Sequence, residues 1–213
     1  MKSEEVFSSD CMKCKRLSGF LGQVKSEHPD YYCKPVKPFG DRKARLLIVG
    51  LAPGMHGANA TGRPFTGDFA GILLYETLYK FGFSNRPDST ALGDGLELKN
   101  CRITNAVKCL PPQNKPTGEE ISVCNDFLRQ ELEALPTGSI VLALGTIAHN
   151  AVLKALGLKY SAYKFGHGHL HRLPRLVLID SYHCSRYNTQ TRRLTDKMFH
   201  DVFRQAQALL NTN

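Results

Sequence analysis

The fold of this chain is decided by the stretch RLLIVGLAPG, residues 45–54. Residues 45–50 are a short apolar run that ends in glycine, which is typical of a strand buried on both faces of a sheet. Residues 51–54 add a proline and a second glycine, and they therefore predict a tight turn directly after the strand. In open α/β sheets ligands bind beyond the carboxyl ends of the strands, so this turn is the first candidate for a functional site.

Strands and helices alternate along the chain after this turn. Further apolar strands are expected over residues 101–107, 140–144 and 175–180, and helices over residues 69–82, 118–135, 146–157 and 192–211. Thr117 and Glu120 fit a capping box at the start of the second of these helices, and Thr146 is expected to cap the third. The last helix has one apolar face, made of Met198, Phe199, Val202, Phe203, Ala206 and Leu210. This alternation predicts a mostly parallel sheet covered by helices on both faces.

The composition is that of a single globular domain over residues 1–213. The chain is 42% hydrophobic and 22% charged, which is ordinary for such a domain. No run approaches the roughly 18 apolar residues of a membrane span. The first ten residues, MKSEEVFSSD, lack the apolar core of a signal peptide, so we expect a cytoplasmic protein. Residues 1–43 are rich in Cys, Lys, Pro and Tyr without a clear period, and we expect a loop-rich arm there.

The charge balance favours a polyanionic partner. Lys and Arg together number 28 against 19 Asp and Glu, which gives a formal net charge of +9. A sequence pI near 9.3 is typical of proteins that bind nucleic acid. We therefore expect a polyanionic partner such as nucleic acid, and with it an association with the nucleoid.

Four of the seven cysteines have a spacing that suits a metal site. Cys11 and Cys14 form a Cys-x2-Cys pair on the arm, and Cys109 and Cys124 are their expected companions. Cys124 lies in the first turns of a helix, where the partial positive charge favours a thiolate. Four thiolates suit either an iron–sulfur cluster or a tetrahedral zinc ion, and the alternative for the first pair is an inert surface dithiol. The other cysteines, Cys33, Cys101 and Cys184, are interpreted as structural.

Polar residues follow several of the strands. Asn105 lies near the end of the second strand, Gly145 follows the third, and residues 181–183 (SYH) follow the fourth. Because the carboxyl ends of parallel strands meet at one edge, these residues are expected to converge on one crevice. The histidine-rich segment 167–171 (HGHLH) is interpreted as a loop or hairpin tip, with a zinc site as the less favoured alternative, because no acidic partner lies near it in sequence.

Two long motifs resemble a known family. The segments GLAPGMHGANATGRPFTGD (50–68) and SYHCSRYNTQTRRLT (181–195), with TNAVKC (104–109) and the four cysteines, resemble the iron–sulfur uracil-DNA glycosylases of family 5, also called type b. Family 4 fits less well, because its proteins carry Glu where this chain has Leu51 and lack the Asn-Thr-Gln-Thr run that this chain has at residues 188–191. The chain departs from the family 5 pattern at Cys184, where Pro is usual, and at Arg192, where Gly is frequent.

The resemblance implies a fold, a cofactor and an activity. The fold is a three-layer α/β/α sandwich around a four-stranded parallel sheet, and the cofactor is a [4Fe–4S] cluster on Cys11, Cys14, Cys109 and Cys124. The cluster would tie the N-terminal arm to the rest of the domain. The activity is removal of uracil, and of other deaminated or damaged bases such as hypoxanthine, from DNA by a monomeric enzyme that leaves an abasic site. The base would flip into a pocket at the carboxyl ends of the strands.

The chemistry of base removal assigns roles to two ionisable residues. Breaking the N-glycosidic bond places positive charge on the sugar and negative charge on the departing base. The site therefore needs a hydrogen-bond donor at the base oxygen and a carboxylate or a positioned water near the sugar. His183 is the expected donor to the base oxygen, with a surface or capping histidine as the alternative. Asp68 is the expected catalytic carboxylate, because Leu51 and Ala52 cannot activate water. Its alternative is the N-cap of the following helix, and both roles can hold together.

The remaining candidates bind the base. Phe65 is the expected stacking ring, with an ordinary core phenylalanine as its alternative. Asn105 is expected to take part in catalysis and to read the base edge with its amide, with a turn asparagine as its alternative. The backbone of Gly50, Leu51, Ala52 and Gly54 is expected to offer amides to the base or to an adjacent phosphate.

The segment after His183 is the expected DNA-binding loop. Its candidate contacts are Ser185, Arg186, Tyr187, Asn188 and Arg192. Such a loop can enter the minor groove and fill the space that the flipped base leaves, although charges of this kind also occur on solvated helix starts. Two other classes of function stay open: a non-catalytic nucleic-acid-binding protein with an iron–sulfur or zinc site, and a small iron–sulfur electron carrier.

Overall fold

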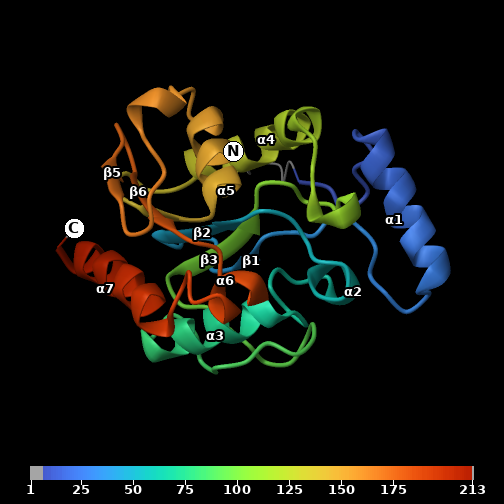
Figure 1. Ribbon diagram of the computed structural model, residues 1–213, viewed down its shortest axis with the longest axis horizontal. Helices are drawn as coiled ribbons and strands as arrows, with labels where there is room; N and C mark the ends of the chain where they lie inside the picture. Colours follow the sequence, from blue (N-terminus) through green and yellow to red (C-terminus); the bar gives the residue numbers. More distant parts are fainter. Residues whose placement is uncertain (1–6, 213) are drawn as a thin grey trace.

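The computed structural model describes residues 7–212 and has an α/β fold built on one mixed sheet (Figure 1). The six strands lie in the order β1-β3-β2-β4-β6-β5. Their bounds are β1 Phe39–Gly40, β2 Leu46–Gly50, β3 Cys101–Asn105, β4 Ile140–Leu144, β5 Leu170–Arg172 and β6 Val177–Ser181. The prediction of a four-stranded sheet was therefore incomplete.

The inner strands are parallel and the edges are antiparallel. β3, β2, β4 and β6 pair in parallel register, whereas β1 pairs antiparallel with β3 and β5 pairs antiparallel with β6. Both edge strands are very short, two and three residues, and carry no apolar alternation that the sequence could display. Every residue of β2, β4 and β6 is buried, which explains their continuous apolar character.

Helices cover both faces of the sheet. Their bounds are α1 Lys15–Glu27, α2 Ala58–Thr61, α3 Phe69–Lys80, α4 Gly118–Glu133, α5 Thr146–Ala155, α6 Arg186–Gln190 and α7 Asp196–Thr212. Two single 3₁₀ turns, η1 Pro112–Asn114 and η2 Tyr160–Ala162, lie in loops. Figure 1 shows α4 and α5 on one face, and α3 and α7 on the other. The order of layers predicted from the sequence is thus observed.

The core has one apolar cluster on each face. Ile48, Leu74 and Phe203 belong to the cluster under α3 and α7. Val49 and Leu128 belong to the cluster under α4 and α5. Successive residues of β2 therefore point to opposite faces, as a strand buried on both sides requires.

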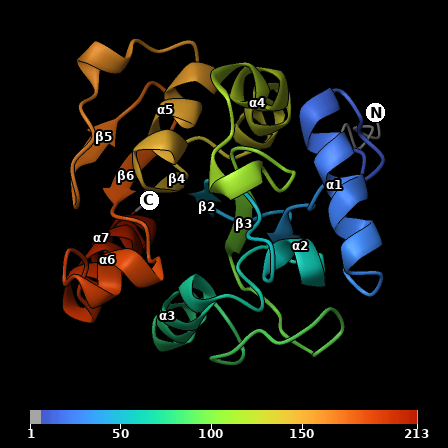
Figure 2. The same cartoon turned by 45° about the vertical axis from the view of Figure 1, so that its right-hand side comes forward.

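The N-terminal arm differs from the prediction. Residues 1–6 lie outside the described part of the chain, and α1 occupies much of the segment that was expected to be loop-rich. Leu17, Leu21 and Val24 are buried at helical spacing and pack in a third cluster. Figure 2 shows α1 beside the main layers rather than within them. The three apolar positions are few among many polar ones, which is why the period was missed.

Other element boundaries shift by a few residues. The capping box of Thr117 and Glu120 is confirmed in both directions. The N-cap of α5 is Gly145 and not Thr146. The terminal helix begins at Asp196, because residues 186–190 form the separate short helix α6 where a loop was expected. None of the helices within residues 7–212 is long and apolar enough to cross a membrane.

Candidate active site

A cavity of about 400 Å³ lies beyond the carboxyl ends of β2, β3 and β6. Its lining consists of Leu51, Ala52, Gly54, Ala58, Phe65, Asp68, Phe69, Ala70, Asn105, Asn114, His183, Ser185 and Arg186. The volume is within the range of small-molecule sites. The structure therefore brings together the three predicted catalytic side chains, which come from three different connections of the sheet.

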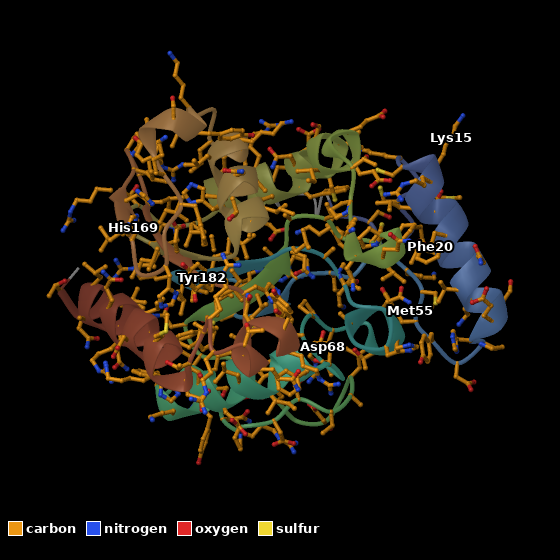
Figure 3. The ribbon with its side chains drawn as sticks, viewed as in Figure 1. Lys15, Phe20, Met55, Asp68, His169 and Tyr182 are labelled. Atoms are coloured by element: carbon orange, nitrogen blue, oxygen red, sulfur yellow. The ribbon has the colours of Figure 1, made fainter. Side chains whose placement is uncertain are left out.

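Asp68 lines this cavity and also caps α3. Its Oδ1 accepts a hydrogen bond from the backbone N–H of Gly71 at 3.0 Å, so the expected cap is confirmed. Burial raises the pKa of the Asp68 carboxyl, and backbone hydrogen bonds from Gly71 and Ala70 partly oppose that rise. Its Oδ2 lies against the backbone of residues 54–57, where a Cβ on Gly57 would approach to 2.6 Å. Figure 3 shows Asp68 at the end of α3 close to α6. The cap holds one carboxylate oxygen and leaves the other beside the turn after β2.

His183 lies opposite, in the connection after β6. Its Nδ1 is buried and has no hydrogen-bond partner among the described residues. Burial lowers the pKa of its imidazole to about 4, so the ring is neutral at physiological pH. The side chain of Asn188 donates a hydrogen bond of 2.8 Å to the backbone carbonyl of His183. Asn188 thus fixes the backbone of His183, and the neutral imidazole is able to donate one hydrogen bond to a ligand.

Asn105 ends β3 and lies close to Gly50. The Oδ1 atom of Asn105 is buried and has no hydrogen-bond partner among the described residues. A Cβ on Gly50 would lie 2.4 Å from that Oδ1 and 2.6 Å from Cζ of Phe65. Glycine is therefore required at position 50 to let the amide and the ring approach the turn.

Phe65 lies between these groups with a left-handed backbone. Its φ is 54°, a region that a bulky side chain rarely adopts, and its ring lies 5.8 Å from that of His183 at an angle of 27°. The hydroxyl of Tyr75 donates a hydrogen bond of 2.7 Å to the carbonyl of the preceding Pro64. A Cβ on Gly71 would clash with the carbonyl oxygen of Phe65. Strained residues that surrounding contacts hold in place are typical of functional sites.

A buried ion pair braces the same turn from outside. Both terminal nitrogens of Arg63 donate to the carboxylate of Asp94, at 2.9 and 3.0 Å. The hydroxyl groups of Thr66 and Ser89 lie 2.6 Å apart. The segment around Asp94 is thereby attached to residues 63–66. This brace leaves no signal in the sequence, because residues 84–98 have the composition of a loop without periodicity.

The expected DNA-binding residues lie on or beside α6. Ser185 caps this helix through its hydroxyl, Tyr187 is 71% exposed, and Arg192 has a φ of 56°. The guanidinium of Arg186 lies 5.1 Å from the centre of the Phe69 ring, at the cavity wall. Asn188 points inward to the carbonyl of His183 and serves the site rather than the surface. Of this segment, Ser185 and Arg186 line the cavity, and we call residues 185–192 its rim.

The four cysteines of the predicted metal site line a second, small pocket. Cys11, Cys14, Cys109 and Cys124 come from the arm, the loop after β3 and helix α4. The backbone N–H of Lys108 donates to the Sγ of Cys124 at 3.3 Å. Burial, and then the charge of the neighbouring thiols, raises the pKa of Cys109 to about 12. Four sulfur donors with apolar neighbours and an amide donor fit a four-thiolate cluster.

The interpretation of the other cysteines as structural stands. Cys33, Cys101 and Cys184 are buried and free. Burial raises the pKa of Cys101 and of Cys184, which leaves both thiols protonated. Cys184 follows His183 directly and packs in the core where proline is usual in the family.

The histidine-rich segment has an acidic partner after all. Residues 167–171 reach β5 of the edge hairpin, and Nε2 of His171 lies 3.1 Å from Oδ2 of Asp180. His149 of α5 lies 2.7 Å from the other oxygen of Asp180. No acid lies close to this segment in the sequence: Asp180 lies nine residues beyond His171, and the pairing of β5 with β6 brings the two side chains together.

Some residues of the site gave no recognisable signal. Ala58, Phe69 and Ala70 line the cavity from helix starts, and Asn114 does so from the loop of η1.

A buried lysine lines the cysteine pocket. The side chain of Lys108 is 1% exposed, and its Nζ lies 2.6 Å from Glu131. From the sequence alone, Lys108 looks like an ordinary charged loop residue next to Cys109. Its burial depends on the packing of α4, which carries Glu131.

These features define the class of protein. The family model for the Uracil DNA glycosylase superfamily matches residues 37–207, and the chain belongs to this superfamily. The match spans the turn after β2, the end of β3 and the connection after β6, which together form the cavity. The predicted family, and with it the class of enzyme, is confirmed.

Individual relatives show which type of uracil-DNA glycosylase this chain is most similar to among those compared. The chain is 45% identical to the type-5 uracil-DNA glycosylase of Thermus thermophilus, over 93% of each chain. It is 43% identical to the type-5 uracil-DNA glycosylase of Pyrobaculum aerophilum, over 93% of this chain and 88% of the relative. Identity to the type-4 uracil-DNA glycosylase of Archaeoglobus fulgidus is 29%, over 82% of this chain and 76% of the relative. The similarity is thus greater to these type-5 enzymes, as the residues at positions 51 and 188–191 predicted.

Proposed function

We propose that this protein hydrolyses the N-glycosidic bond of uracil in DNA and leaves an abasic site. One observation carries the proposal. A carboxylate, an amide and a neutral imidazole line one cavity, and both Asn105 Oδ1 and His183 Nδ1 have no hydrogen-bond partner within residues 7–212. Buried polar atoms without partners are costly to keep, and a bound base would satisfy them.

The amide of Asn105 matches the edge of a flipped uracil. Uracil presents one N–H donor between two carbonyl oxygens, and an asparagine side chain both accepts and donates. Phe65 would stack on the face of the base, as enzymes that flip bases require. Gly50 leaves the space in which the amide and ring reach the base. Asn105 therefore reads the base, and Phe65 supports it.

His183 stabilises the departing base. Negative charge develops on a carbonyl oxygen of uracil as the glycosidic bond breaks, and a neutral imidazole donates one hydrogen bond to that oxygen. The low pKa of His183 keeps the ring in this neutral form. Removal of such a donor is expected to cost about 10² to 10³ in rate.

Asp68 acts on the sugar side. Its carboxylate offsets the positive charge of the oxocarbenium-like sugar and positions the attacking water. The capping bond to Gly71 fixes the rotamer, and Oδ2 stays beside residues 54–57. Because Leu51 and Ala52 offer no polar side chain, the carboxylate of Asp68 supplies this function.

The cavity admits other bases as well. Its lining is mostly apolar, and its volume of about 400 Å³ leaves room beyond one pyrimidine ring. A site with few polar side chains rejects ligands weakly, because a hydrophobic wall discriminates mainly by size. Deaminated purines such as hypoxanthine are therefore included in the proposed substrates.

The rim of the cavity binds DNA. Arg186 and Arg192 would contact phosphates, and the exposed ring of Tyr187 would fill the space that the flipped base leaves. Ser185 and Asn188 hold α6 and His183 in place beneath them. This division agrees with the net charge of +9.

Cys11, Cys14, Cys109 and Cys124 would hold a [4Fe–4S] cluster. When bound, the cluster supplies a rigid cross-link among the arm, the loop after β3 and helix α4 rather than a step of the reaction. Arg16 in α1 forms a bidentate ion pair with Glu120 of α4, at 2.7 Å for each bond. The arm is therefore also attached by side chains beside the cluster site.

The test is a nicking assay on a duplex oligonucleotide that holds one uracil. We expect strand cleavage only after alkali, which shows base removal without lyase activity, and none on the matched cytosine duplex. Binding without cleavage would instead support a non-catalytic nucleic-acid-binding protein. A second duplex with hypoxanthine measures the breadth of the substrate range.

A further inference from the structure

A second group of ionisable side chains lies apart from the cavity. It consists of His149 of α5, His171 of β5 and Asp180 of β6, and their ligating atoms lie within 4.8 Å of one another. Asp180 and His149 are buried, and His171 is partly buried. Neither the proposed reaction nor the family motifs give these side chains a role.

The Asp180 carboxylate has partners on both oxygens. Its Oδ1 faces Nδ1 of His149 at 2.7 Å, and its Oδ2 faces Nε2 of His171 at 3.1 Å. The backbone N–H of Gly166 donates to the same Oδ2 at 3.2 Å. Neighbouring groups therefore satisfy both buried oxygens.

The partners of His149 suit a ring that carries two protons. Its Nε2 lies 2.8 Å from the carbonyl oxygen of Tyr163, which only accepts hydrogen bonds, so Nε2 is protonated. Its Nδ1 lies 2.7 Å from a carboxylate oxygen, and a second proton on Nδ1 would complete a charge-assisted pair. Burial alone lowers the pKa of His149, but the hydrogen bond and charge of Asp180 outweigh it and raise the pKa. The other groups that face the ring are His171 and the edge of the Phe165 ring.

The ion pair attaches a loop to the strand that leads to His183. Asp180 binds the loop of residues 163–169 through Gly166, and His149 binds it through Tyr163. The same loop bonds the backbone of Asp180, because Gly168 N–H donates to its carbonyl at 2.8 Å. In Figure 3, His169 of this loop lies beside the edge of the sheet that β5 and β6 form.

The loop in turn braces the residue before His183. Nδ1 of His167 accepts a hydrogen bond from the backbone N–H of Tyr182 at 3.1 Å. The rings of His167 and Tyr182 stack with centres 5.0 Å apart at an angle of 21°. The guanidinium of Arg193 also contacts Tyr182 and lies 4.6 Å from the centre of its ring. A continuous set of contacts therefore links Asp180 to the position of His183.

We propose that the buried His149–Asp180 ion pair is a positioning device for His183. The imidazolium and the carboxylate hold the 163–169 loop in one place, and the loop fixes Tyr182 and the backbone that presents the catalytic ring. This inference rests on the proposed function for its catalytic consequence, but the ion pair itself is a separate property. A divalent metal ion is the other cation that these three side chains suit. A proton is favoured, because 2.7 Å between Nδ1 and Oδ1 is the length of a charge-assisted hydrogen bond.

The protonation state is tested by nitrogen NMR of protein labelled at histidine. At pH 7.5 an ordinary histidine, with a pKa of about 6.5, is largely neutral. We expect one histidine to show two protonated nitrogens, and that signal to vanish in His149→Gln. A neutral tautomer at His149, or stoichiometric zinc that is lost in His149→Gln, would overturn the proposal.

The positioning role is tested with Asp180→Asn, and with His171→Gln should the first variant not fold. His169→Gln, an exposed histidine of the same loop, is the matched control. We expect a single-turnover excision rate about tenfold lower in Asp180→Asn at full reaction amplitude, with unchanged affinity for undamaged duplex. A purely structural role would lower the amplitude instead. An unchanged rate constant in a folded variant would contradict the proposal.

One readout does not depend on activity. The ring signals of His183 are expected to shift in Asp180→Asn and to stay in place in His169→Gln. If the wild-type protein removes no base from any duplex, the proposed function fails, and these signals still decide whether the ion pair positions His183. Unmoved His183 signals in Asp180→Asn would overturn the positioning role.

Discussion

Gly50 and Asn105 face each other as the last register pair of the β2–β3 ladder, and a single methyl group at position 50 would lie 2.4 Å from the Asn105 amide oxygen. Strand β2 therefore ends at a position, residue 50, where only glycine fits. This relationship couples the end of the sheet to the reading of the base.

We expect Gly50→Ala to abolish most excision activity. The new Cβ would displace Asn105 or the ring of Phe65, because Cζ of Phe65 lies only 2.6 Å from where that Cβ would be. Single-turnover kinetics on a uracil duplex measure the loss, which we expect to exceed about tenfold. Gly22→Ala in exposed α1 is the control, because nothing lies within 4 Å of its Cβ. That variant is expected to keep full activity and to gain about 0.5 to 1 kcal/mol of stability.

Asp68→Asn separates the two roles of that residue. Asparagine is as good an N-cap as aspartate, so the melting temperature is expected to change little. The loss of charge is expected to lower single-turnover excision of every base by about 10² or more. Asp88→Asn, at an exposed acid in the 84–98 loop, is the control. Full activity at unchanged stability in Asp68→Asn would leave Asp68 only a cap.

The imidazole of His183 is expected to stay neutral across the physiological range. Its pKa is lowered to about 4 by burial, so its ring signals should not titrate between pH 8 and 5 in a proton NMR series. Between pH 6.5 and 4 the unfolded chain binds a proton at this residue and the folded chain does not. Stability is therefore lost as pH falls through that window. A midpoint near 6.5 for His183 would contradict the buried site.

Cys124→Ala and Cys33→Ala distinguish the cysteine pocket from the other thiols. Protein purified without air is expected to contain about four iron and four sulfide per chain, as a [4Fe–4S] cluster requires. We expect Cys124→Ala to lose the colour, because its sulfur lines the pocket. Cys33 lies outside that pocket and its variant should retain iron. Stoichiometric zinc without sulfide would replace the cluster assignment.

Affinity for DNA is expected to depend on salt through Arg186. The logarithm of the binding constant should fall linearly with the logarithm of salt concentration, and Arg186→Ala should reduce the slope by about 0.9. Arg129→Ala is the control, because Arg129 lies exposed on α4 in ion pairs with Asp126 and Glu133. Equal slopes in the three proteins would remove Arg186 from the DNA surface.

The interior of the sheet was predictable because burial on both faces leaves a strong local pattern. Residues 140–144 read as a strand from composition alone, and Thr117 with Glu120 marked a helix start by chemistry. α1 was not predictable from the same reasoning, because only Leu17, Leu21 and Val24 carry its period. α6 begins with a serine cap and buries none of its residues, so nothing apolar announces it.

The candidate site was predictable where chemistry follows a strand end. Asp68, Asn105 and His183 each come after a strand or before a helix, and parallel strands bring such positions together. The pairing of His149 with Asp180 depends on how α5 packs on β6, which no local pattern encodes. The brace of Arg63 by Asp94 likewise depends on the path of a loop without periodicity.

The cysteine pocket also sets an order of events during synthesis. Cys11 and Cys14 leave the ribosome first, whereas Cys109 and Cys124 follow only after strands β1, β2 and β3 and helices α1, α2 and α3 have been made. At usual elongation speeds the interval is on the order of ten seconds. During that time the arm has neither its sulfur partners nor Glu120 as the ion-pair partner of Arg16. The thiols of Cys11 and Cys14 are thus exposed to oxidants and to other metal ions in the nascent chain. Maturation of this protein therefore depends on how well these two thiols are protected during synthesis.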